Sequence, residues 1–112
     1  MAFRHPAEEK ALTFLKLQGH EVLAANYHAG FAEIDLITKD ASGTLHFVEV
    51  RAWQKGGLKH PLESLDARKQ NRMRQAAALF LQERNAKEGR DSVSFDLALV
   101  DGDAVEVHFA VF

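Results

Sequence analysis

Two short apolar runs in this chain carry acidic residues, and this pattern most limits what the chain can fold into. Residues 32–37 read AEIDLI and residues 47–51 read FVEVR, and both runs look like strands. Neighbouring side chains of a strand point to opposite faces, so Glu49 and Arg51 share one face of the second run. Acids inside apolar strands indicate a functional site, because buried charge is costly unless it is paired or used.

The segment 39–44 between the two runs is short and rich in turn residues, which predicts a hairpin. If Asp35 lies opposite Glu49, the same register brings Glu33 near Arg51. The alternation fixes only the parity of this pairing and not its offset. The alternative is that these acids lie on an exposed sheet face as ordinary salt-bridged residues.

The size and composition of the chain predict one globular domain over residues 1–112. Hydrophobic residues make up 46% of the sequence and charged residues 27%, which excludes a disordered chain and gives no membrane-spanning segment. Cysteine is absent, so a disulfide framework and a thiolate metal site are both excluded. Residues 1–6 lack the apolar stretch of a signal peptide, and we expect a cytoplasmic protein without membrane contact.

Hydrophobic periodicity predicts an α+β fold with the element order αβββαββ, a mixed β-sheet flanked by helices. The predicted helices span 6–18 and 66–86, and the predicted strands span 21–28, 31–38, 45–53, 93–100 and 105–109. Residues 54–64 are predicted to form a loop. In the first helix Glu8 lies on the same side as Leu12 and Leu15, which predicts that Glu8 points inward.

The charge of the chain is unevenly distributed, although its formal net value is only -2. Residues 51–90 carry a balance of +6 and the remaining residues a balance of -8. The candidate nucleic-acid-binding residues in the basic part are Arg68, Lys69, Arg72 and Arg74 of the second helix and Lys55 of the loop before it. Such a surface binds phosphates with an affinity that falls with salt. The alternative is a solvated basic helix face.

The single tryptophan and the six histidines are more typical of packing or surface residues than of a binding site. Trp53 is suited to stacking on a base, but a single tryptophan at a strand end is more often a packing or dimer contact. The six histidines show none of the paired helical spacing typical of a zinc site, and we expect most of them to be surface or packing residues.

The acidic runs are suited to phosphodiester hydrolysis, which needs a hard cation to neutralise developing charge and prepare a water. Mg²⁺ prefers oxygen ligands, and Glu8, Asp35 and Glu49 supply carboxylates that the Val50 carbonyl could supplement. Arg51, two residues after the second acid, reaches the same pocket.

In these residues the chain resembles the YraN-like family of uncharacterised bacterial proteins. The matching residues are Ala7, Glu8, Ala11, Gly19, Asn26, Lys69 and His108 with the stretches 33–37, 47–50, 76–81 and 95–96. This resemblance implies a fold like those of restriction endonucleases and archaeal Holliday-junction resolvases. It also implies that Glu8, Asp35 and Glu49 are the metal-facing acids of a PD-(D/E)XK-type site that takes Mg²⁺ or Mn²⁺. Arg51 stands where the family usually has lysine.

Three functions are compatible with this sequence. The first is a metal-dependent endonuclease acting on structured DNA, with Glu8, Asp35, Glu49 and Arg51 in its site. The second is a DNA-binding module without turnover, since arginine does not readily exchange a proton. The third is a protein-interaction domain whose exposed segment 107–112 binds a partner. Junction-cutting proteins of similar fold act as dimers, so a homodimer is compatible with each interpretation.

Overall fold

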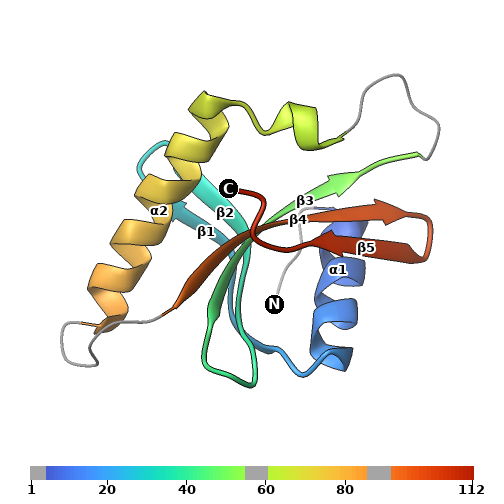
Figure 1. The fold of residues 1–112 in the computed structure, drawn as a ribbon, viewed down its shortest axis with the longest axis horizontal. Helices are drawn as coiled ribbons and strands as arrows, with labels where there is room; N and C mark the ends of the chain where they lie inside the picture. The colour runs from blue at the N-terminus through green and yellow to red at the C-terminus, as the bar shows by residue number, and fades with distance from the viewer. Residues whose placement is uncertain (1–4, 55–60, 86–91) are drawn as a thin grey trace.

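A five-stranded mixed β-sheet with one α-helix on each face forms the centre of the protein (Figure 1). The computed structural model describes residues 5–54, 61–85 and 92–112. Its elements are α1 (Pro6–Leu17), β1 (Glu21–Ala29), β2 (Ala32–Lys39), β3 (Leu45–Ala52), η1 (Pro61–Ser64), α2 (Ala67–Asn85), β4 (Val93–Asp101) and β5 (Ala104–His108). The predicted fold class and element order are confirmed, and the short 3₁₀ helix η1 is an addition inside the predicted loop.

The strand order in the sheet follows the sequence, β1-β2-β3-β4-β5. All neighbours are antiparallel except β3 and β4, which run parallel from Leu45↔Val93 to Ala52↔Val100. A parallel pair needs a long crossover between its strands, and α2 lies in that crossover. The sheet therefore contains one parallel pair, β3 and β4, which are the strands before and after α2.

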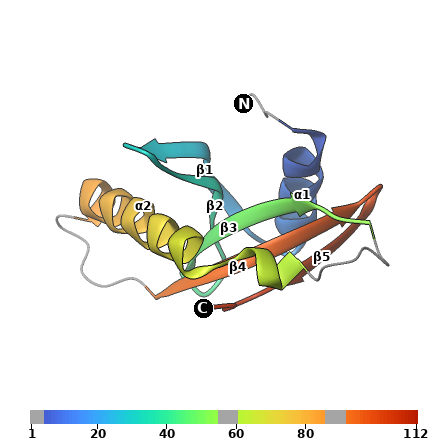
Figure 2. The ribbon, with the colours of Figure 1, turned by 90° about the horizontal axis from the view of Figure 1, so that it is seen from above.

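The two faces of the sheet carry separate hydrophobic clusters. The cluster on the α2 face includes Ile34, Ile37, Phe47, Met73, Ala76, Ala77, Leu97 and Leu99. The cluster on the α1 face includes Ala7, Ala11, Leu12, Leu15, Leu36, Val48, Ala98 and Val100. In the view from above, α1 and α2 lie on opposite sides of the twisted sheet, with α2 beside β1 and β2 (Figure 2).

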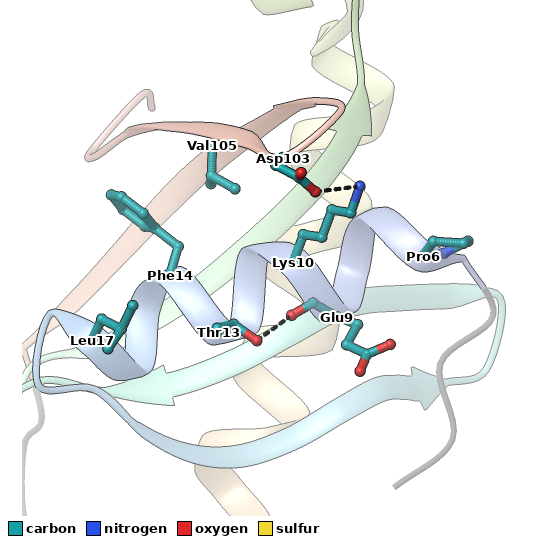
Figure 3. Close-up of a pocket in the computed structure, with 8 residues that line it drawn as sticks. All are labelled: Pro6, Glu9, Lys10, Thr13, Phe14, Leu17, Asp103 and Val105. Atoms are coloured by element: carbon teal, nitrogen blue, oxygen red, sulfur yellow. Dashed lines mark hydrogen bonds and ion pairs between the residues drawn. The ribbon is translucent and has the colours of Figure 1, made fainter.

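Polar contacts also hold α1 against the sheet, at the outer side of the helix (Figure 3). The Lys10 ammonium donates to the Gly102 carbonyl at 2.6 Å and lies 3.2 Å from the Asp103 carboxylate. Both partners belong to the β4–β5 turn. A hollow of about 520 Å³ lies between this helix face and β5, where Phe14, Leu17 and Val105 form its apolar lining.

The segment 109–112 folds back across the sheet, so the expectation that the whole of 107–112 is exposed is wrong. The Val111 amide donates to the Phe95 carbonyl at 2.8 Å. The Phe112 ring stacks on Phe95, with ring centroids 4.8 Å apart, and the Arg74 guanidinium lies 4.9 Å from the Phe112 centroid. Apolar burial against the α2-face cluster accounts for this return of the chain. Phe109, at 48%, and Ala110 remain exposed.

Candidate functional site: a buried carboxylate pair

The start of α1 directs Glu8 toward the sheet. Pro6 occupies the first turn, and the His5 ring nitrogen Nδ1 accepts the Ala7 amide at 3.0 Å, which caps the helix. Helical spacing then places Glu8 on the buried side with Leu12. The Glu8 side chain is only 6% exposed, as its inward position in the sequence predicts.

The strands β2 and β3 separate beside Asp35. Their ladder runs from Lys39↔Leu45 to Leu36↔Val48, a register that brings Asp35 level with Glu49 and supplies the offset that the sequence left open. At this point the Asp35 carboxylate accepts the Val50 amide at 2.8 Å in place of a backbone carbonyl. The alternation of β2 also changes there, because Ile34 belongs to the α2-face cluster and Leu36 to the α1-face cluster.

Glu33 and Arg51, which this register would bring near each other, each have another charged partner. Glu33 lies 3.5 Å from the His28 ring on β1, and Arg51 lies 2.8 Å from Glu49 on its own strand. The separation of β2 from β3 beyond Leu36 is the physical reason, since it ends the ladder before Glu33 is reached.

Glu49 is a buried acid between one negative and two positive neighbours. It is 4% exposed, and its carboxylate lies 2.8 Å from the Arg51 guanidinium and 3.2 Å from the Lys69 ammonium on α2. Burial raises the pKa of Glu49, and the negative charge of Asp35 and a hydrogen bond with Asp35 raise it further. Arg51 and Lys69 lower this pKa but do not cancel the increase.

A hollow of about 350 Å³ joins the N-terminus of α1 to this pair. Its lining includes Glu8, Asp35, Val50 and Arg51. Glu49 lies beside it, in contact with Asp35 and Lys69. Within residues 5–54, 61–85 and 92–112, no group of three or more histidine or acidic side chains is arranged to hold a metal ion. Glu8 and Asp35 thus line one hollow, and Glu49 lies beside it in contact with Asp35.

The predicted basic residues divide into three kinds. Lys69 is part of the acidic site itself, and Arg74 packs against Phe112. Arg68 and Arg72 are exposed on the first turns of α2. Lys55 lies outside the described residues.

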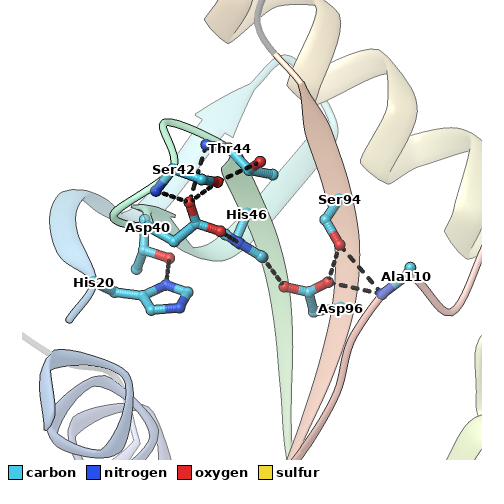
Figure 4. Close-up of polar contacts among 9 residues, drawn as sticks. His20, Asp40, Ser42, Thr44, His46, Ser94, Asp96 and Ala110 are labelled. Carbon is cyan, nitrogen blue, oxygen red and sulfur yellow. Dashed lines mark hydrogen bonds and ion pairs between the residues drawn. The ribbon is translucent and has the colours of Figure 1, made fainter. Parts of the chain in front are cut away.

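The sequence reasoning missed a buried ion cluster around His46 (Figure 4). The two ring nitrogens of His46 lie 2.6 Å from Asp96 and 2.8 Å from Asp40, and Asp96 is fully buried. Asp96 also accepts from the Ser94 hydroxyl and the Ala110 amide. A carboxylate accepts and a ring nitrogen donates only when it carries a proton, so two carboxylates at the two nitrogens favour the positively charged imidazolium.

The titration of this cluster follows from its contacts. Burial lowers the pKa of His46, but hydrogen bonds to Asp96 and Asp40 outweigh burial and the net pKa is raised. The hydrogen bond to His46 holds the pKa of Asp40 well below its usual range. Burial and the nearby His46 lower the pKa of His20, whose ring centroid is 4.7 Å from that of His46. The signal in the sequence is weak, because the carboxylates are 6 and 50 residues from His46.

Fold and site together define a class of protein: an α+β domain with a mixed sheet, in which two carboxylates meet where neighbouring strands separate. The uncharacterised protein family UPF0102 has a sequence model that matches residues 7–100. The chain therefore belongs to the UPF0102 family, which confirms the YraN-like resemblance.

Relatives from several bacteria support this membership. A UPF0102 protein of Pseudomonas putida is 42% identical over 96 residues, which cover 86% of this chain and 76% of the relative. A UPF0102 protein of Persephonella marina is 37% identical over 90 residues, 80% of this chain and 75% of the relative. A third UPF0102 protein, from Caldicellulosiruptor saccharolyticus, is 36% identical over 80 residues, which cover 71% of this chain and 67% of the relative.

In the described part of the chain, neither helix is both long enough and apolar enough to span a membrane. The cytoplasmic location stays a prediction.

Proposed function

We propose that this protein binds nucleic acid and cleaves phosphodiester bonds of structured DNA at the hollow beside Asp35 and Glu49. The observation that carries the proposal is the contact of two buried carboxylates, Asp35 and Glu49, where Glu49 is also paired with the cations Arg51 and Lys69. Like charges crowded in a buried position are typical of functional sites, because their mutual repulsion is a cost to stability.

The donor atoms of this site fit Mg²⁺ or Mn²⁺. Mg²⁺ is usually held by one or two carboxylates and keeps several waters, so the close pair of Asp35 and Glu49 is sufficient. Glu8 and the Val50 carbonyl are the further oxygen ligands available at the hollow. A bound ion would neutralise charge on the phosphate and lower the pKa of an attacking water.

The remaining side chains have roles that their positions support. The Val50 amide orients the Asp35 carboxylate at 2.8 Å. Arg51 is 40% exposed in its side chain and Lys69 25% exposed, so both can contact a phosphate while they remain near Glu49. Arg68 and Arg72, exposed on α2, would bind phosphates that flank the reacting one.

A second candidate function is DNA binding without cleavage, and Arg51 favours it. Arginine stays protonated at all working pH values, so it can stabilise a phosphate but does not exchange a proton with water. This candidate keeps every binding contact described above and lacks turnover.

The test is cleavage of labelled branched, flapped and linear DNA in Mg²⁺ or Mn²⁺, with wild type compared with Glu49→Gln purified identically. We expect the wild type to cut branched or flapped DNA and the variant to have lost at least 100-fold in rate, the scale typical of removing one catalytic group. Equal activity in both proteins would identify a contaminating nuclease. Salt-sensitive binding by an inactive wild type would support the second candidate, and the absence of both activities would overturn both.

The basic start of α2 gives a separate prediction for binding. Arg72→Ala removes one exposed charge, so it should weaken binding to all DNA sequences alike and reduce the salt-dependence slope by about one unit. Fluorescence anisotropy at several salt concentrations measures this slope. Lys16→Ala on α1, on the other side of the sheet, is the matched control and should leave the slope unchanged. An unchanged slope in Arg72→Ala would exclude Arg72 from the DNA contact.

A further inference from the structure

A second hollow, of about 570 Å³, lies between the end of β3 and the β4–β5 hairpin. Its lining includes Trp53, Leu99, Asp101, Glu106 and His108, and we name it the Trp53 hollow. Its volume lies within the range of small-molecule sites, roughly 300–1,000 Å³. Neither the acidic site nor the α2 surface uses these residues.

The Trp53 hollow opens on the sheet face to which β3 directs Glu49 and Arg51, while the hollow at Glu8 and Asp35 lies toward α1 and is also lined by Arg51. Phe47 of β3 belongs to the α2-face cluster, and alternation along the strand puts Glu49 and Arg51 on that face. Trp53 packs against the same cluster. On this face α2 lies over β1 and β2, and β4 and β5 extend away from it (Figure 1).

The strand register gives the distance between the acidic pair and the Trp53 hollow. Arg51 pairs with Leu99 and Leu99 pairs with Glu106, so these three residues form one row across β3, β4 and β5. Glu49, Leu97 and His108 form the next row. Neighbouring strands are about 4.8 Å apart, so β5 is roughly 10 Å from β3, a distance that one or two nucleotides can span.

The chemistry of the Trp53 hollow suits a base better than a phosphate. Trp53 and Leu99 form an apolar wall, and an indole stacks on the flat face of any base. Asp101 and Glu106 are exposed carboxylates that repel phosphate. One oxygen of Glu106 pairs with the His108 ring at 2.8 Å, and its other oxygen and the Asp101 carboxylate can accept hydrogen bonds from amino groups. Cytosine presents an amino group at its position 4, where uracil presents a carbonyl acceptor.

From these observations we propose that the Trp53 hollow receives one unstacked nucleobase, with a preference for bases that carry an amino group. The proposal rests on the proposed function, since the phosphate chain of the same strand passes the acidic pair. It assigns the substrate class: DNA with an unpaired base within one or two nucleotides of the bond at Asp35 and Glu49.

The sole tryptophan of the chain makes the test direct. Trp53 fluorescence is followed while the full chain is titrated with oligodeoxycytidine or oligodeoxyuridine of eight nucleotides, without divalent metal. Anisotropy of labelled copies of the same oligonucleotides measures binding independently. We expect quenching by both, with roughly fivefold tighter binding of the cytosine oligomer, the lower limit for one good base contact.

The matched variants are Glu106→Gln, in the hollow, and Glu9→Gln, on the outer side of α1. Glu106→Gln should reduce the preference for cytosine, and Glu9→Gln should retain it. Both acids are exposed, so neither change threatens folding.

The outcomes separate this proposal from the proposed function. Binding seen by anisotropy without a change in Trp53 fluorescence would overturn the base site and leave DNA binding intact. If anisotropy detects no binding, deoxycytidine alone is titrated: quenching supports the base site without the proposed function, and its absence overturns both. Quenching by an arginine-rich peptide but not by either oligomer would identify a basic peptide as the occupant and overturn the proposal.

Discussion

At the scale of single residues, the sequence predicts the burial of the acids but not the contacts of the histidines. The burial of Glu8 and Glu49 follows from local periodicity, because each shares a side with apolar neighbours in its own element. The environment of His46 is made by Asp96, which is 50 residues away. Periodicity carries no information on such a contact, and the pairing depends on the parallel register of β3 and β4.

The His46 cluster predicts a pH-dependent contribution to stability. His46→Gln leaves the fully buried Asp96 without its cation, so the free energy of unfolding should fall by about 3 kcal/mol, as for other broken buried ion pairs. Because the pKa of His46 is raised, its stabilisation is full below the ordinary value of 6.5 and is lost as pH rises through the folded pKa. Because the pKa of Asp40 is lowered, its stabilisation is present above 3.8 and is lost as pH falls further.

Urea denaturation of wild type and His46→Gln between pH 4 and 9 measures this effect. The difference between them should be largest at about pH 4 to 6.5 and should shrink at higher pH. His28→Gln is the control, because His28 is 58% exposed in its side chain and should change stability little. A difference that is constant over the whole pH range would contradict a charged His46.

At the scale of elements, the sequence predicts where helices and strands occur, and tertiary contacts set their details. The sequence predicts the second helix over 66–86 and the helix spans Ala67–Asn85, because its apolar stripe and its start signal are both local. The bulge of β1 between Val22 and Ala24 and the positive φ of Asn26 have no comparable signal. The bulge lies opposite Ile37 and Thr38 of β2, so it depends on the pairing of two strands and not on a local pattern.

The cap of α2 gives a prediction at this scale. The Asp66 carboxylate accepts the Lys69 amide at 2.9 Å, which is the usual N-cap contact. Asp66→Ala should therefore lower the free energy of unfolding by about 1 kcal/mol. Asp66→Asn should keep most of this stabilisation, because asparagine also caps helices. Urea denaturation of both variants checks this. If both lose the same amount, the contribution of Asp66 is its charge at the helix start and not its hydrogen bond.

At the scale of the whole molecule, the arrangement of elements connects the acidic pair to the basic helix. Two neighbouring strands and a crossover helix supply Asp35, Glu49 and Lys69 to one place, and the crossover is required by the parallel pair β3 and β4. The charge segregation in the sequence indicates a basic segment that contains the second helix. It did not predict that Lys69 belongs to the acidic site, because that contact needs the packing of α2 on the sheet.

The crowded pair predicts that a divalent cation stabilises the whole fold. An ion that binds only the folded protein at ten times its Kd contributes about 1.4 kcal/mol, or a rise in Tm of roughly 5 °C for a domain of this size. Millimolar Mg²⁺ or Mn²⁺ should produce this rise in the wild type and not in Asp35→Asn, whose amide still accepts the Val50 hydrogen bond but lacks the charge. Thermal unfolding at constant ionic strength measures it. Asp103→Asn, which changes an exposed acid near α1, should keep the full shift. Equal shifts in all three proteins would mean that the cation acts on the general charge of the surface and that Asp35 and Glu49 do not bind it.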